Sequence, residues 1–217
     1  MLSQPSEEFQ AHGRSHSLLH TDNDRARLVD VLSAEFKKKT KRAKIEPHAF
    51  ICYQDLKGIW NTDRIKTLLS DSHLPPDVLA IIYEQMLIIL SVLVHIGARR
   101  CLDNFRHRLF YPDTAQPAFT DAKIPLPRNE IKRFLGEEFL CDQFYQHQWK
   151  FKPYRLEINE GDSVKVIEEY WRLPFEEVEE NIGSGTAGRV DRALISPKYL
   201  KNSDGSDYDM VSPSAFH

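Results

Sequence analysis

Three of the nine glycines in this 217-residue chain fall within six positions of one another, in the segment Ile182-Gly183-Ser184-Gly185-Thr186-Ala187-Gly188-Arg189-Val190. Glycines spaced G-x-G-x-x-G let backbone N–H groups approach a phosphate closely, because no Cβ stands in the way. This spacing occurs both in dinucleotide-binding folds and in phosphotransferases. The segment therefore predicts binding of nucleotide phosphates, and the residues on either side must distinguish the two classes.

The residues that flank the glycines have the pattern of strands. Upstream, Pro174 to Ile182 carries spaced apolar positions between a proline and a glycine,. Downstream, the chain up to Ile195 contains β-branched residues, and no N-capping residue separates Gly188 from Val190. A dinucleotide-binding turn runs directly into a helix, so a nucleotide-binding protein of that other fold would require a helix after Gly188. Strand, glycine turn, strand favours a phosphotransferase.

The segment Ile182 to Val190 closely resembles the glycine-rich loop of protein kinases, and the resemblance covers residues 174–217,. It implies that Ile182 and Val190 pack on the faces of an adenine and that the glycine backbone covers the phosphates of Mg-ATP. The loop tip, Thr186-Ala187, lacks the bulky aromatic residue of many kinases, which implies a less tightly closing lid. By resemblance, the reaction is phosphoryl transfer to Ser or Thr of a protein.

The chain departs from the kinase pattern after the loop. No V-A-x-K lysine, catalytic aspartate or magnesium-binding motif follows, and neither Lys198 nor Lys201 lies in an apolar strand pattern,. We therefore expect a truncated kinase-like chain with an incomplete ATP site, no catalytic residues and no metal ligands. The alternative is a helical protein-interaction or regulatory module that carries a vestigial kinase segment.

Composition limits the partners and the location. The chain is 41% hydrophobic and 28% charged, which is typical of a soluble globular protein,. With 29 basic and 32 acidic residues the net charge is −3, so neither nucleic acid nor a membrane is an expected partner,. The three cysteines form no C-x-x-C pair, and the N-terminus lacks the features of a signal peptide,. We expect an intracellular protein, either cytoplasmic or nuclear, because the basic run at 37–44 fits a nuclear import signal or a solvated helix end.

The patterning predicts an α+β fold, in which a mainly helical N-terminal region precedes a short antiparallel β segment. Residues 1–24 are predicted to be a disordered tail, 25–150 a helical domain with a possible protein partner, 151–174 a β or linker segment, and 175–217 the kinase-like segment,. The first helix should bury a stripe formed by Leu28, Val31, Leu32 and Phe36.

The helical region contains one strongly apolar span. Pro75 and Pro76 should start a single helix from Asp77 to Ile96, with a narrow polar stripe formed by Asp77, Glu84, Ser91 and His95,. Because Glu84 and Gln85 interrupt the apolar run, a buried core helix is favoured over a membrane span. Asn61 or Thr62 should cap one helix, and Asn129 should cap another.

Three further segments are ambiguous or irregular. Basic residues from Arg99 to Arg108 alternate with Leu102, Phe105 and Leu109, which favours an amphipathic helix over a phosphate- and base-binding surface,. The proline-rich stretch 111–128 is predicted to be a functional loop or a boundary between helical subunits. The aromatic residues from Phe139 to Trp149 should form a core face, and 154–158 with 164–167 should form two strands joined by a turn.

Overall fold

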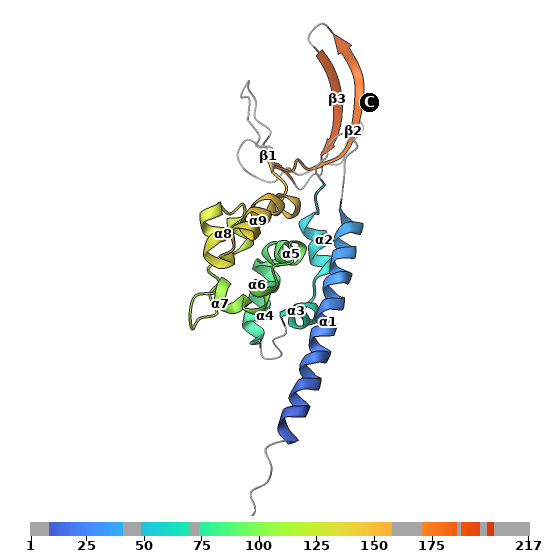
Figure 1. Ribbon diagram of the computed structural model, residues 1–217. Coiled ribbons are helices and arrows are strands. Elements are labelled where there is room, and N and C mark those ends of the chain that lie inside the picture. Colours follow the sequence, from blue (N-terminus) through green and yellow to red (C-terminus); the bar gives the residue numbers. More distant parts are fainter. Residues whose placement is uncertain are drawn as a thin grey trace, which may run out of the picture. The chain divides into compact units, whose positions relative to one another are not determined.

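The computed structural model describes residues 9–40, 49–69, 74–157, 171–185, 188–195 and 199–201 (Figure 1). The fold is α+β and dominated by helices, as the sequence predicts. The chain divides into two compact units, one formed by Met1–Lys38 with Lys57–Lys123 and the other by Lys39–Leu56 with Ile124–His217. The border after Lys123 falls inside the proline-rich stretch 111–128 and inside the region predicted as one helical domain, so the units differ from the predicted domains.

The first unit contains most of the helices. They are α1 (Phe9–Lys39), α2 (Tyr53–Ile59), α3 (Thr62–Leu69), α4 (Pro76–Gln85), α5 (Leu87–His95), α6 (Arg99–Asp103), α7 (Phe105–Leu109) and the short 3-10 helix η1 (Asp121–Lys123). The end of α1 and the first residues of α2 belong to the second unit.

Helix α1 begins well before the predicted position. It starts at Phe9, so the prediction of a disordered tail is wrong for residues 9–24. The only strong helix-weakening residue in that stretch is Gly13, whose effect of about 1 kcal/mol does not end a helix,. Leu32 and Phe36 are buried as predicted, whereas Val31 is 41% exposed and lies outside the buried stripe.

Helix α3 begins where the sequence predicts. The side-chain oxygen of Asn61 accepts the backbone N–H of Arg64 at 2.8 Å, which is the bond an N-cap residue makes to the third residue of a helix,. The predicted N-cap at Asn61 is therefore confirmed.

The predicted single helix from Asp77 to Ile96 is wrong. Helix α4 ends at Gln85 and α5 begins at Leu87, with a bend of 80° between them. The reason lies in Asp121, whose carboxylate accepts the backbone N–H groups of Ile88 at 2.9 Å and of Ile89 at 3.0 Å. These N–H groups belong to the first turn of α5, where a helix has donors without intrahelical partners. A carboxylate from elsewhere in the chain thus caps the second half of the apolar span.

The apolar span is buried in protein, as predicted. Every residue of α5 from Leu87 to Val94 is buried, including Ser91, which the sequence placed on a polar stripe. Within the described ranges no single helix is long and apolar enough to cross a membrane, and only the bent pair α4 and α5 passes that test when taken together.

The basic stretch after α5 forms two short helices instead of one. Phe105 and Leu109 of α7 are buried, as is Leu102 of α6, while Arg99, Arg100 and Arg106 are exposed. This arrangement agrees with the amphipathic interpretation. Phe105 and Phe110 are only 3% and 4% exposed, so neither ring is accessible for stacking on a base.

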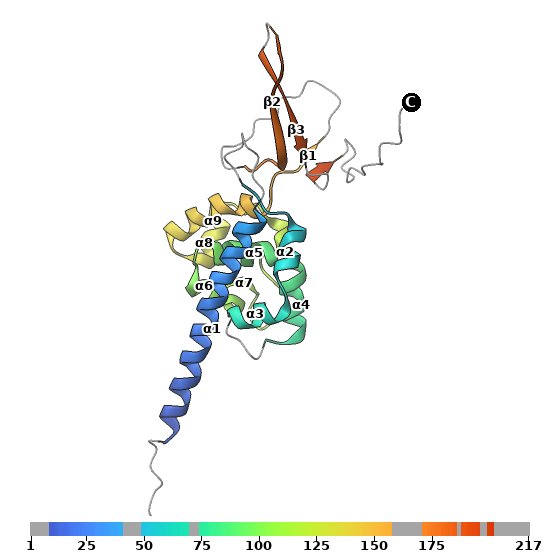
Figure 2. The ribbon, with the colours of Figure 1, turned by 90° about the vertical axis from the view of Figure 1, so that its right-hand side faces the viewer.

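The described residues of the second unit form two complete helices and four strands. These elements are α8 (Arg128–Leu135), α9 (Glu138–Phe151), β1 (Leu156–Glu157), β2 (Phe175–Gly185), β3 (Gly188–Ile195) and β4 (Leu200–Lys201). β2 and β3 form an antiparallel pair, which Figure 2 shows as a twisted two-stranded ribbon. β1 pairs in parallel with β4, whereas the strand partner predicted for it, 164–167, lies outside the described residues.

The packing of α8 and α9 departs from prediction in two places. Helix α8 begins at Arg128 with Pro127 in the cap position and no side-chain cap, so the predicted N-cap at Asn129 is wrong. Phe144 is buried against Phe134, but Phe139 is 71% exposed and takes no part in the predicted core face. Helix α8 ends with Gly136 as its C-cap, which has a φ of 78°, and α9 begins at Glu138, so the two do not form one continuous helix.

A buried amide fixes the segment before α8. The side chain of Gln148, on α9, accepts the backbone N–H of Leu126 at 2.7 Å and donates to the carbonyl oxygen of Leu126 at 3.1 Å. Gln148 is fully buried, and these two bonds satisfy its amide as well as the backbone of an otherwise irregular segment,.

Candidate functional site

The predicted glycine loop forms the turn end of the β2–β3 hairpin. Gly183 pairs with Val190, Ser184 with Arg189, and Gly185 with Gly188. Gly185 and Gly188 are therefore the last residue pair of the β2–β3 ladder before the turn. Two residues, Thr186 and Ala187, connect them and lie outside the described residues.

The structure tests whether a helix follows the glycines, as a dinucleotide-binding turn requires,. Gly188 opens a strand that continues to Ile195, and it does not open a helix. The alternative of a dinucleotide-type turn, which requires a helix at this point, is therefore wrong. The strands predicted on both sides of the glycines are confirmed.

The ladder is irregular before the glycines. The register shifts between Phe175 and Glu177 and again between Glu179 and Gly183. Ile182 and Asn181 lie in the second irregular stretch, where β2 has more residues than β3. Extra residues of this kind bend a strand and increase its twist, and they often occur next to binding sites.

The hairpin brings all the predicted site residues to one end of a two-stranded ribbon, apart from the two at the tip. Ile182, Gly183, Ser184 and Gly185 end β2, whereas Gly188, Arg189 and Val190 begin β3. All three glycines are paired residues of the β2–β3 ladder at this end of the hairpin. Lys201 lies in the two-residue strand β4, next to Leu200.

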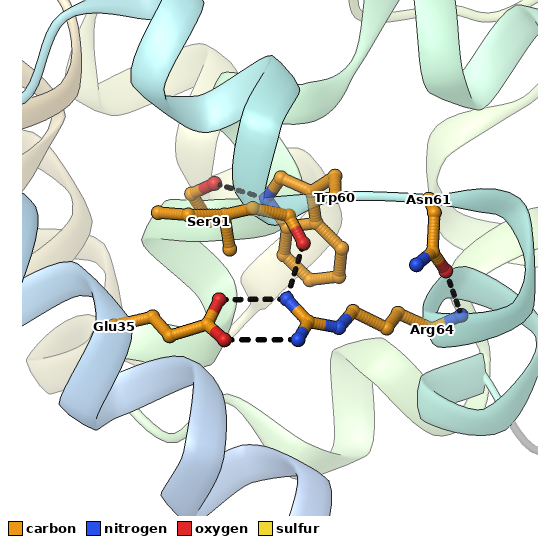
Figure 3. Close-up of polar contacts among 6 residues, drawn as sticks. Glu35, Trp60, Asn61, Arg64 and Ser91 are labelled. Carbon is orange, nitrogen blue, oxygen red and sulfur yellow. Dashed lines mark hydrogen bonds and ion pairs between the residues drawn. The ribbon is translucent and has the colours of Figure 1, made fainter.

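The first unit contains a polar network that sequence patterns did not predict (Figure 3). The guanidinium of Arg64 on α3 binds the carboxylate of Glu35 on α1 through two bonds of 2.6 and 2.9 Å, and it also donates to the backbone carbonyl of Ile59. The bond to Arg64 is the main cause that lowers the pKa of Glu35, and the same bond raises the pKa of Arg64. This geometry fixes α3 against α1.

A second set of hydrogen bonds involves the buried side chains of Trp60 and Ser91. The indole N–H of Trp60 donates to the hydroxyl of Ser91 at 2.9 Å, and this hydroxyl donates to the carbonyl oxygen of Leu87 at 2.6 Å (Figure 3). Ser91 is fully buried and both of its bonds are made within the protein. These contacts give Ser91 and Trp60 a structural role, joining the chain before α3 to α5.

The described residues show few other groups suited to chemistry. Among them, no group of three or more His, Cys, Asp or Glu side chains could hold a metal ion. Burial raises the pKa of the Cys101 thiol to about 12, which keeps it protonated and unreactive at neutral pH,. Burial also raises the pKa of Cys141.

Comparisons with known proteins add no assignment. No protein-family model, no curated protein and no solved structure matches this chain.

Proposed function

We propose that the β2–β3 hairpin is a kinase-type lid for the phosphates of ATP, and that this chain carries the lid without the groups that transfer a phosphoryl group. The observation that carries the proposal is the register of the hairpin, in which Gly185 and Gly188 close the ladder on either side of a two-residue tip. Strands on both sides of a G-x-G-x-x-G segment are the arrangement of the phosphate-covering loop of protein kinases.

The proposed ligand is Mg-ATP, bound by Ile182 to Val190. In such a lid the main-chain N–H groups of the glycines contact the phosphates, and the apolar residues at 182 and 190 contact the adenine. Phosphoryl transfer also needs a lysine on the phosphates, a base and carboxylates for Mg²⁺. The 217 residues contain none of the motifs that supply those groups. We therefore propose weak ATP binding and no kinase activity for this chain.

The experiment is a titration of the ¹⁵N-labelled chain with Mg-ATP, followed by the amide resonances of Gly183, Gly185 and Gly188. We expect these resonances to shift at millimolar ATP, which corresponds to about −4 kcal/mol of binding free energy. Adenosine, which lacks the phosphates, serves as the matched ligand and should leave the Gly185 and Gly188 amides unmoved. Gly185→Val and Gly188→Val should each abolish the shifts, because a side chain blocks the close approach of the phosphates.

Two results would contradict the proposal. Submicromolar affinity, about −8.2 kcal/mol or tighter, would mean that the site is more complete than proposed. Glycine amides that do not respond to about 10 mM Mg-ATP, a concentration well above a millimolar dissociation constant, would mean that the hairpin is no phosphate lid. The second outcome would favour the alternative, in which the helices form a protein-interaction or regulatory module and residues 175–217 are vestigial.

A further inference from the structure

Helix α1 contains three histidines at a regular spacing. His12, His16 and His20 follow one another at intervals of four residues, and all three lie within the helix Phe9–Lys39. In an α-helix, positions four residues apart differ by about 40° around the axis and by about 6 Å along it. The three positions therefore form a row along one face of α1, which we name the histidine row.

The helix is what gives this spacing a chemical meaning. The composition of residues 1–24 predicts a disordered tail, in which side chains four positions apart have no fixed relation to each other,. Helix α1 instead begins at Phe9, three residues before the first of the histidines. Neighbouring positions of the histidine row are thus held as i and i+4 positions of a helix, whose Cβ atoms are about 5–6 Å apart.

Two histidines at i and i+4 of a helix can bind one metal ion together. The H-E-x-x-H helices of metalloproteases supply two nitrogens to Zn²⁺ from this spacing. Imidazole nitrogen suits Zn²⁺, whereas Mg²⁺ and Ca²⁺ prefer oxygen ligands. The histidine row contains two such pairs, His12 with His16 and His16 with His20. The outer two positions are about 12 Å apart along the axis, too far to share an ion whose bonds to nitrogen are about 2 Å long.

The histidine row lies on the N-terminal part of α1, before the ion pairs that hold this helix to the rest of the first unit. Arg25 of α1 pairs with Asp103 of α6, and Glu35 of α1 pairs with Arg64 of α3. Both pairs follow the row in the sequence. In Figures 1 and 2 the N-terminal part of α1 continues past α3 and α4, which belong to the same unit. The backbone around the row is therefore open to an ion from the solvent.

We propose that the histidine row binds one Zn²⁺ ion per chain, through either of its two i, i+4 pairs. The two pairs exclude each other because both need His16. Zinc usually has four ligands, so two positions on the ion are left for water. Binding weakens at acidic pH, because a protonated imidazole cannot bind a metal ion. The inference does not depend on ATP binding, since the β2–β3 hairpin belongs to the other unit.

The test is a titration of the full ¹⁵N-labelled chain with zinc chloride. We expect the amide resonances of residues 12–20 to shift and their hydrogen exchange to slow, because an ion held by two successive turns stabilises the helix between them. Magnesium chloride is the matched control ion and should do neither. His16→Ala removes a ligand from both pairs and should lower the Zn²⁺ affinity about tenfold or more. His12→Ala and His20→Ala each leave one of two equivalent pairs, so each should lower it only about twofold.

An exchange variant separates the spacing of the histidines from their number. His16→Leu/Leu18→His keeps the composition of the chain, but no two of its histidines in α1 are three or four residues apart. It should lose Zn²⁺ affinity as His16→Ala does. If the exchange variant bound Zn²⁺ as tightly as the unchanged chain, the helical spacing would be irrelevant and the proposal would be overturned. Amides of residues 12–20 that do not respond to about 1 mM Zn²⁺ would overturn it as well, as would an affinity that His16→Ala leaves unchanged.

Discussion

The stability of the first unit should depend strongly on the side chain of Asp121. It is 8% exposed and accepts the first-turn N–H groups of α5 from Ile88 and Ile89, at 2.9 and 3.0 Å. We predict that Asp121→Ala destabilises the protein strongly. Removal of the carboxylate leaves two buried N–H groups without these bonds, at the point where the apolar span bends by 80°.

The size of the effect follows from the two bonds. Loss of an N-cap side chain destabilises a protein by about 0.5–2 kcal/mol. A buried donor left without a partner contributes about 1–3 kcal/mol. Since these contributions overlap for the same two N–H groups, we expect a loss of about 3 kcal/mol for Asp121→Ala. Asp121→Asn keeps one accepting oxygen and should lose about half as much.

The assay is urea unfolding followed by far-UV circular dichroism, combined with hydrogen exchange at the amides of Ile88 and Ile89. Exchange at these two amides should accelerate in Asp121→Ala more than exchange elsewhere in the unit. Asp30→Ala is the matched control, because Asp30 is exposed on α1, and it should change stability by less than about 0.5 kcal/mol,. If Asp121→Ala were as stable as this control, the capping role of Asp121 would be refuted.

Two further predictions concern the glycine at the end of α8 and a half-buried histidine on α9. Gly136 has a φ of 78° and an added Cβ would meet nothing within 4 Å, so Gly136→Ala should lose about 1 kcal/mol through backbone strain alone,. Gly58 lies within helix α2, and an added Cβ there would also meet nothing within 4 Å. Gly58→Ala should therefore raise the free energy of unfolding, measured in urea, by about 0.5–1 kcal/mol. Equal effects of the two substitutions would contradict this reasoning. Burial, followed by the charges of Lys150 and Arg172, lowers the pKa of His147 in the folded state. Its contribution to stability is therefore complete above the unfolded pKa of about 6.5 and is lost as the pH falls toward the lower folded pKa, so His147→Gln should flatten the decline in unfolding free energy below pH 6.5.

Local patterns predicted those features that depend on neighbouring residues. The strands around the glycines could be predicted because apolar and β-branched positions, together with turn residues, act over a few residues. The N-cap at Asn61 is likewise a contact to Arg64, three residues along the chain. Burial of α5 followed from its apolar composition, since an apolar helix has no polar face to present to water,.

The sequence was misleading where a group far along the chain overrides the conformation that neighbouring residues favour. Leu87 to His95 continues the helical pattern of α4, and nothing nearby indicates a break at Met86. The break depends on Asp121, more than thirty residues away in a stretch without periodicity. The Arg64–Glu35 pair is similar, because its partners lie 29 residues apart and no local rule connects them.

The sequence by itself determined that the chain is mainly helical with a glycine hairpin near its end, since both follow from short-range periodicity and turn chemistry. Only the tertiary structure decided where α4 and α5 separate and that Phe139 is exposed. The physical reason is that buried hydrogen bonds and the exposure of a side chain depend on which segments meet in space, and those meetings join residues that no local pattern connects.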